Sequence, residues 1–174
     1  RPPSEGRSLI IQVANGCSYN KCTFCEMYTD QQKRFRPKPI EEIETELRDL
    51  SKAGYPVKRV FLADGDAMTL STRRLVDILQ MINKYYPDIQ RVSSYCLPRN
   101  LKKKSVEDLQ DLADLGLSLL YVGCESGDNE VLRLVNKGED YDSSLSALAK
   151  IKRAGIKSSV MILNGLGGPE LSEQ

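Results

Sequence analysis

Residues 119–127, LLYVGCESG, contain the pattern that decides the fold: an apolar run followed at once by glycine and a carboxylate. A related order recurs at 57–66, VKRVFLADGD, and at 157–168, KSSVMILNGLGG, where the apolar run also leads into glycine. Short apolar runs that end in turn residues are typical of buried strands. In parallel α/β folds the binding loops lie just past the carboxyl ends of the strands. The repeated pattern therefore predicts a parallel sheet with one functional edge.

Five strands and the helices between them are predicted along the chain. The predicted strands are residues 9–13, 57–63, 91–96, 119–124 and 157–163. Apolar residues spaced three and four apart predict helices from Ile40 to Gly54, around 75–82 and from 106, with Ser105 as the N-cap. Shorter helices are predicted at 129–136 and 143–154. This alternation predicts parallel strands in sequential order, which both a doubly wound sheet and a barrel satisfy.

Composition limits the kinds of protein that this chain can be. Its 174 residues suit one domain, and 40% apolar with 28% charged residues is a globular composition. Lys plus Arg number 25 and Asp plus Glu 24, so the net charge of +1 gives no argument for nucleic acid or a membrane surface. No apolar run reaches membrane-span length and no leader is evident, so we expect a cytoplasmic protein with reduced cysteines. Because a barrel needs more than five strands, we expect residues 1–174 to be a domain that is incomplete at its C-terminal end.

Metal chemistry in this chain must use thiolates or carboxylates, because the sequence has no histidine and five cysteines. Three of them, Cys17, Cys22 and Cys25, form the C-x4-C-x2-C motif CSYNKCTFC. Three thiolates on one short loop can hold three irons of a [4Fe–4S] cubane and leave the fourth iron without a nearby protein ligand. The alternative is a structural zinc site, which needs four protein ligands and would have to recruit Cys96 or Cys124.

The remaining cysteines and basic residues have structural interpretations as well as functional ones. Strand alternation places Cys124 on the face opposite Glu125, as a buried structural thiol, whereas Cys96 ends its strand near the functional edge. The basic stretch Lys33 to Lys38 is interpreted as a solvated loop, with an anionic-substrate site as the alternative. Residues 102–104, three lysines, are expected to form an exposed turn.

The cysteine motif resembles that of the radical S-adenosylmethionine (SAM) superfamily. That family's usual signature is C-x3-C-x2-C with an aromatic residue just before the last cysteine, and Phe24 stands in that place. The first gap here has one extra residue, a departure that some branches share. Asp64-Gly65-Asp66 stands where the superfamily places a Gly-Gly-Glu turn, and the resemblance implies that this turn receives the methionine amino group.

The resemblance continues after the fourth predicted strand. Glu125-Ser126-Gly127, followed by Lys137 and Gly138, is similar to a stretch of tRNA methylthiotransferases and oxygen-independent coproporphyrinogen oxidases. It implies that Glu125 bonds the cofactor's ribose or sulfonium side and that Lys137 lies near its carboxylate; an N-cap role is the alternative for Glu125. Leu163 and Gly165 stand where the family packs adenine. The usual acidic residue three positions beyond is absent.

Taken as a family resemblance, these motifs imply a partial (β/α)6 barrel with helices outside. They imply an enzyme with a [4Fe–4S] cluster and SAM, which it cleaves reductively to a 5′-deoxyadenosyl radical that acts on an unidentified substrate. An electron donor such as a flavodoxin or ferredoxin is implied as a partner. The alternatives are a noncatalytic iron–sulfur electron-transfer module and a zinc-stabilised binding module. The substrate itself is not indicated.

Overall fold

The computed structural model describes residues 2–28 and 34–171. Five parallel strands form one sheet in the order β1-β4-β5-β6-β7, as predicted, with β1 and β7 at its edges. The strands are β1 (Leu9–Gln12), β4 (Arg59–Ala63), β5 (Arg91–Cys96), β6 (Leu117–Glu125) and β7 (Lys157–Ile162). Because the strands are sequential and parallel, every strand ends at the same edge of the sheet.

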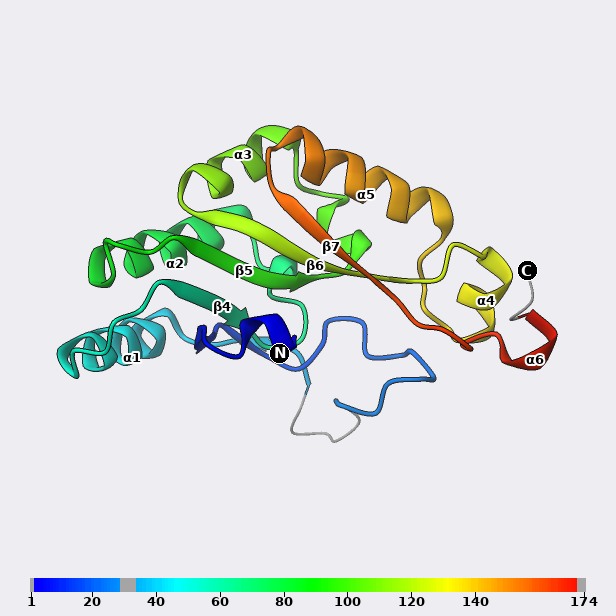
Figure 1. Ribbon diagram of the computed structural model, residues 1–174, viewed down its shortest axis with the longest axis horizontal. Helices are drawn as coiled ribbons and strands as arrows, with labels where there is room; N and C mark the ends of the chain where they lie inside the picture. The colour runs from blue at the N-terminus through cyan, green and yellow to red at the C-terminus, as the bar shows by residue number, and fades with distance from the viewer. Residues whose placement is uncertain (1, 29–33, 172–174) are drawn as a thin grey trace.

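Helices lie along one side of this sheet, with α1, α2, α3 and α5 visible as a layer in Figure 1. The helices are α1 (Ile40–Lys52), α2 (Thr72–Tyr85), α3 (Val106–Asp114), α4 (Asn129–Leu134), α5 (Tyr141–Arg153) and α6 (Gly168–Leu171). Three short 3-10 turns lie between these elements or before them: η1 (Pro3–Glu5), η3 (Ala67–Thr69) and η4 (Pro98–Leu101). In the described part of the chain, no helix has both the length and the apolarity that crossing a membrane requires.

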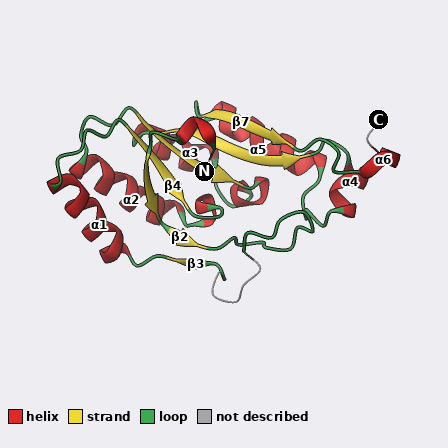
Figure 2. Cartoon of the chain, turned by 60° about the horizontal axis from the view of Figure 1, so that its bottom comes forward, coloured by secondary structure: helices red, strands yellow, loops and turns green. Residues whose placement is uncertain are grey.

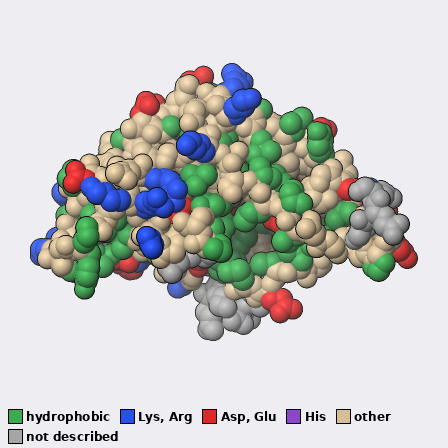
Figure 3. Space-filling view, viewed as in Figure 1, with side chains coloured by type: hydrophobic (Ala, Val, Ile, Leu, Met, Phe, Trp, Pro, Cys, Tyr) green, Lys and Arg blue, Asp and Glu red, His purple; other side chains and the backbone are tan. Residues whose placement is uncertain are grey.

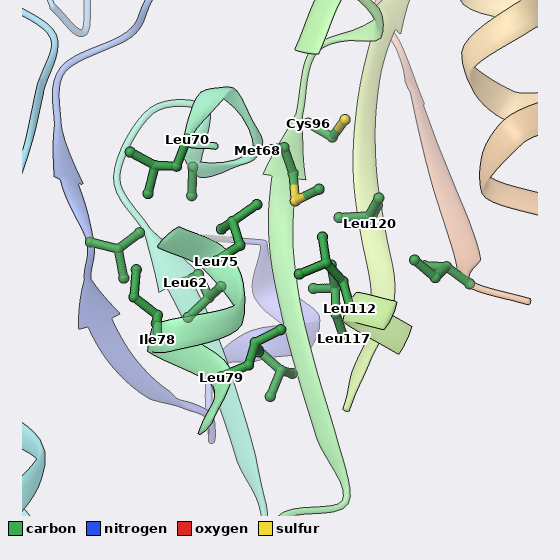
Figure 4. Packing of buried hydrophobic residues seen from close by; sticks show 14 of the residues in the cluster. Leu62, Met68, Leu70, Leu75, Ile78, Leu79, Cys96, Leu112, Leu117 and Leu120 are labelled. Atoms are coloured by element: carbon green, nitrogen blue, oxygen red, sulfur yellow. The ribbon is translucent and has the colours of Figure 1, made fainter. Parts of the chain in front are cut away.

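The core lies between the sheet and these helices. The apolar stripe of α2 is completely buried against the sheet. A helix with one buried face has apolar residues three and four positions apart, which is the spacing that predicted this helix. Figure 4 shows this packing, with α2 and the strands β4 to β6 contributing side chains to one cluster. Its labelled members include Leu62, Leu75, Ile78, Leu79, Cys96, Leu112 and Leu120.

The opposite face of the sheet carries aromatic rings and the N-terminal turn. Phe61, Tyr95 and Tyr121 pack with ring centroids 5.2 to 6.2 Å apart. The fully buried Glu5 of η1 accepts hydrogen bonds from the Tyr121 hydroxyl at 2.7 Å and from Arg91 at 2.8 Å. The N-terminal turn is thereby fixed onto this face of the sheet.

A small second sheet was not predicted. It pairs β2 (Ala14–Asn15) antiparallel with β3 (Arg36–Pro37), and Figure 2 shows the two strands beside each other. Part of the expected solvated basic loop therefore pairs with the chain that leads into the cysteine motif, while Lys33 lies outside the described residues. Proline can take part at such a site because β3 is short and belongs to a two-stranded sheet.

The expectation of an exposed lysine turn at 102–104 is wrong for Lys104. Only 6% of Lys104 is exposed, and its ammonium donates to the Leu70 carbonyl at 2.7 Å. Burial lowers the pKa of this ammonium. Ser105 is the N-cap of α3 as predicted, and its capping box with Asp108 fixes where the lysine turn ends. The bond from Lys104 to Leu70, the C-cap residue of η3, holds this turn against η3.

Candidate functional site

The carboxyl ends of the strands and the cysteine motif enclose a cavity of about 230 Å³. Figure 3 shows this side of the molecule hollowed, with hydrophobic side chains bordering the hollow. Eight of the predicted site residues line the cavity: Cys17, Cys22, Phe24, Cys25, Gly65, Asp66, Glu125 and Lys137. Residues far apart in the sequence thus meet at the one edge that the strand-end pattern predicted.

Three other predicted residues do not line this cavity. Asp64 lies beside it and accepts a hydrogen bond from the Tyr28 hydroxyl. Leu163 has 42% of its surface exposed, and its backbone amide donates to the Glu125 carbonyl at 2.9 Å. Gly165 has open space where a side chain would begin. Their assignment to cofactor binding stays a prediction.

The three motif cysteines lie on the loop that follows β2, each partly buried. Burial raises the pKa of the Cys17 thiol, and the nearby Asp66 carboxylate raises it further. Burial also raises the pKa of Cys22, against the opposing effect of the Lys137 ammonium. Within residues 2–28 and 34–171, no three metal-binding side chains are already gathered around a single point. Three soft thiols that border one cavity are nevertheless a donor set suited to an iron–sulfur cluster.

The turn after β4 is docked directly onto the cysteine loop. Gly65 has φ +49°, and a side chain there would collide with the backbone of Gly16 and Cys17. Only glycine allows the two segments to approach this closely. The buried Asp66 carboxylate accepts a 2.8 Å hydrogen bond from the Ser18 amide and a 3.0 Å bond from the Asn100 side chain. Asp66 therefore joins the cysteine loop to the turn after β5.

Glu125 and Lys137 form an ion pair at the wall of the cavity. Their charged atoms are 2.9 Å apart, with only 9% and 3% of the two side chains exposed. A side chain at Gly123 would come within 2.6 Å of the Glu125 carboxylate, so glycine leaves the space that this pair occupies. The Lys137 ammonium also lies 5.8 Å from the ring centroid of Phe24, which is a residue of the cysteine motif. The pair places both signs of charge beside the thiols.

The N-cap alternative for Glu125 is wrong. The N-cap of α4 is Asp128, whose side chain accepts from the amides of Glu130 and Val131. Glu125 instead has φ +68° at a register shift between β6 and β7, a conformation that costs free energy in a non-glycine residue. That conformation orients its carboxylate toward Lys137 and the cavity.

The two cysteines outside the motif are both buried. Cys124 is 4% exposed, packs in the core and does not line the cavity, as strand alternation predicted. Cys96 is 1% exposed, belongs to the same core and also borders the cavity. Burial is the main reason that the pKa of the Cys96 thiol is raised. Of these two cysteines only Cys96 borders the cavity, so a zinc site there would have to recruit Cys96 as its fourth thiolate.

Comparison with known families agrees with this geometry. Residues 11–174 match the family model of the radical SAM superfamily, which is nearly the whole chain. The chain belongs to this superfamily. Membership in this superfamily implies a [4Fe–4S] cluster and SAM as cofactors. The three cysteine thiols that border the cavity are suited to such a cluster.

Several characterised relatives align with most of this chain. The 4′-phospho-dehydrooxetanocin synthase of Priestia megaterium is 27% identical over 86% of this chain and 22% of its own length. The tRNA-2-methylthio-N(6)-dimethylallyladenosine synthase of Pseudothermotoga lettingae is 28% identical over 87% of this chain and 36% of its own. The heme chaperone HemW of Bacillus subtilis is 24% identical over 88% and 44%. The chain thus spans less than half the length of each of these relatives.

Solved structures show the same fold. The cobalamin-dependent SAM radical enzyme OxsB, with aqua-cobalamin and SAM bound, superimposes with a TM-score of 0.74 at 21% identity, over 90% of this chain and 24% of that one. Methylornithine synthase gives a TM-score of 0.67 at 20% identity, over 91% and 45%. The five-stranded sheet with its helices is therefore a fold that this chain shares with both enzymes.

Some residues at the site carry no recognisable signal in the sequence. Tyr28, Tyr95 and Met161 border the cavity, and Asn100 holds Asp66. Tyr28 follows the last motif cysteine by three positions but belongs to no pattern that marks it, and the other three come from β5, η4 and β7, far from the motif in sequence. Their roles follow only from the tertiary arrangement.

Proposed function

We propose that this chain is the cofactor-binding part of a radical SAM enzyme, with Cys17, Cys22 and Cys25 as ligands of a [4Fe–4S] cluster. The observation that carries the proposal is that all three thiols and the Glu125–Lys137 pair border one cavity at the carboxyl ends of parallel strands. When bound, the cluster would supply the electron for reductive cleavage of SAM. Such chemistry belongs to the cofactor, and the protein supplies binding, orientation and electrostatics.

The residues of the cavity divide this task by their chemistry. The Lys137 ammonium is the cation available to a carboxylate of the cofactor, and the Glu125 carboxylate can accept hydrogen bonds from hydroxyl groups. The Asp64-Gly65-Asp66 turn would receive an amino group through backbone carbonyls. Phe24 and Met161 add apolar surface, which excludes water from the reacting centre.

Substitution of the cysteines tests the ligand assignment. We expect Cys17→Ala, Cys22→Ala and Cys25→Ala each to abolish cluster retention after anaerobic reconstitution. Cys124→Ala is the matched control, because it removes a thiol from the core outside the cavity. Iron and sulfide per chain are the measurement. A Cys124→Ala protein without iron, or a Cys22→Ala protein with its full complement, would overturn the assignment.

The remaining functional assignments concern the whole protein. We propose an electron donor of the flavodoxin or ferredoxin class as partner, an unidentified small-molecule or macromolecular substrate, and a cytoplasmic location. The alternatives, an electron-transfer module and a zinc-stabilised module, predict no effect of SAM on the metal centre. That difference makes the cofactor titration decisive.

A further inference from the structure

Two adjacent residues of η4 hold the cysteine loop, Asn100 through Asp66 and Arg99 by direct contact. The Asn100 amide group donates to the Asp66 carboxylate, which accepts from the Ser18 amide. Arg99 places its guanidinium carbon 3.7 Å from the ring centroid of Tyr19. Ser18 and Tyr19 directly follow Cys17, so the turn after β5 grips the loop beside its first cysteine.

Arg99 is held in place by a second set of contacts. Its Nε and its backbone amide both donate to Glu139 Oε1, at 2.8 and 2.9 Å. The Glu139 side chain is completely buried, and Ser143 donates to its other oxygen at 2.9 Å. An Nη group of Arg99 donates to the Gly138 carbonyl at 2.5 Å. A guanidinium fixed at both ends presents one face to Tyr19 without further loss of side-chain entropy.

The segment 135–139 closes around the loop from the other side. The Tyr19 hydroxyl donates to the Asn136 side chain at 3.2 Å, and Asn136 donates to the Lys21 carbonyl at 2.9 Å. Gly138 has φ +67°, and a side chain there would collide with both Tyr19 and Arg99. Glycine is therefore needed where the stack and the segment meet.

We propose that Arg99 is a positioning residue for the cysteine loop. Its guanidinium, fixed by Glu139, clamps Tyr19 and thereby orders the four residues between Cys17 and Cys22. Those residues form no regular helix or strand, so side-chain contacts must supply the order that a preformed ligand site needs. The inference rests on the proposed function for what the thiols bind, whereas the clamp itself belongs to the chain without a cluster.

Amide hydrogen exchange of the full, cluster-free chain tests the clamp. Tyr19→Leu removes the ring and leaves the Arg99–Glu139 pair intact, and Arg99→Lys keeps the charge without the planar stack. We expect both variants to accelerate exchange in peptides covering 17–25 by roughly two- to thirtyfold, the range that cation–π contacts support. Tyr19→Phe keeps the stack and loses only the 3.2 Å hydroxyl bond to Asn136, so its exchange should be much slower than that of Tyr19→Leu. Arg48→Lys, on the exposed side of α1, should exchange like the unaltered protein.

Two further measurements separate the clamp from general destabilisation. Arg99→Lys should add little acceleration when Tyr19 is already Leu, because the two residues act as a pair. In the reconstituted protein, Tyr19→Leu should lose iron to a chelator faster than Tyr19→Phe. Unchanged exchange at 17–25 in Tyr19→Leu, or additive effects of the two substitutions, would overturn the clamp. A chain that binds no cluster would overturn the proposed function and leave the exchange result standing on its own.

Discussion

At the scale of single residues, the proposed cofactor site depends most on the buried Glu125–Lys137 pair. Glu125→Gln removes one charge-assisted acceptor, and we expect SAM affinity to fall about ten- to a hundredfold. The substitution also leaves the buried Lys137 ammonium without its counter-charge, so the melting temperature should fall too. Calorimetric titration with SAM and thermal unfolding measure the two effects.

A double variant separates these effects. Glu125→Gln with Lys137→Met removes the unpaired charge and should recover much of the lost thermal stability, whereas SAM affinity should stay low. If Glu125→Gln lowers the melting temperature and leaves SAM affinity unchanged, Glu125 is structural and leaves the proposed site.

At the scale of elements, Asp66 connects the cysteine loop, the turn after β4 and η4. Asp66→Asn keeps the size of the side chain and removes an acceptor from a buried network. We expect a loss of about 1–3 kcal/mol in the free energy of unfolding of the cluster-free chain. Urea unfolding measures it, with Asp77→Asn on the exposed side of α2 as control. Equal stabilities for the two variants would show that Asp66 does not hold the loop.

Elements with strong local patterns could be predicted from the sequence, and contacts between elements could not. The apolar stripe of α2 and the Ser105 cap could be predicted from spacing alone. Strand alternation likewise predicted that Cys124 lies in the core, on the face opposite Glu125. Lys104 was expected to be exposed because nothing next to it indicates that the Leu70 carbonyl will receive its ammonium. The Arg99–Tyr19 stack joins residues 80 positions apart, which no periodicity reveals.

At the scale of the whole molecule, Glu5 fixes the N-terminal turn onto the face of the sheet that lies opposite the helices. Burial, the largest influence, raises the pKa of Glu5, but hydrogen bonds from Ser8, Tyr121, Ser93 and Arg91 outweigh it and leave the pKa below its ordinary 4.5. A carboxyl group with a depressed native pKa stabilises the fold fully above pH 4.5. This contribution is lost as the pH falls through the native pKa.

The pH dependence of stability therefore contains a component from Glu5. Between neutral pH and pH about 3, unfolding free energies should decline more steeply for the unaltered chain than for Glu5→Gln, whose side chain does not titrate. Chemical unfolding at a series of pH values measures the difference. Parallel pH profiles for the two proteins would show that the N-terminal turn is not held by an ionised Glu5.

The cofactor titration of the reconstituted metal centre tests the central claim most directly. The chain is reconstituted anaerobically with iron and sulfide, reduced, and titrated with SAM while the EPR spectrum of the cluster is recorded. We predict a cluster signal that SAM shifts in a saturable way, because the three motif cysteines would hold three irons and leave the fourth open to SAM. A cluster whose spectrum is unchanged at saturating SAM, or a protein that takes up zinc and no iron–sulfur cluster, would contradict it.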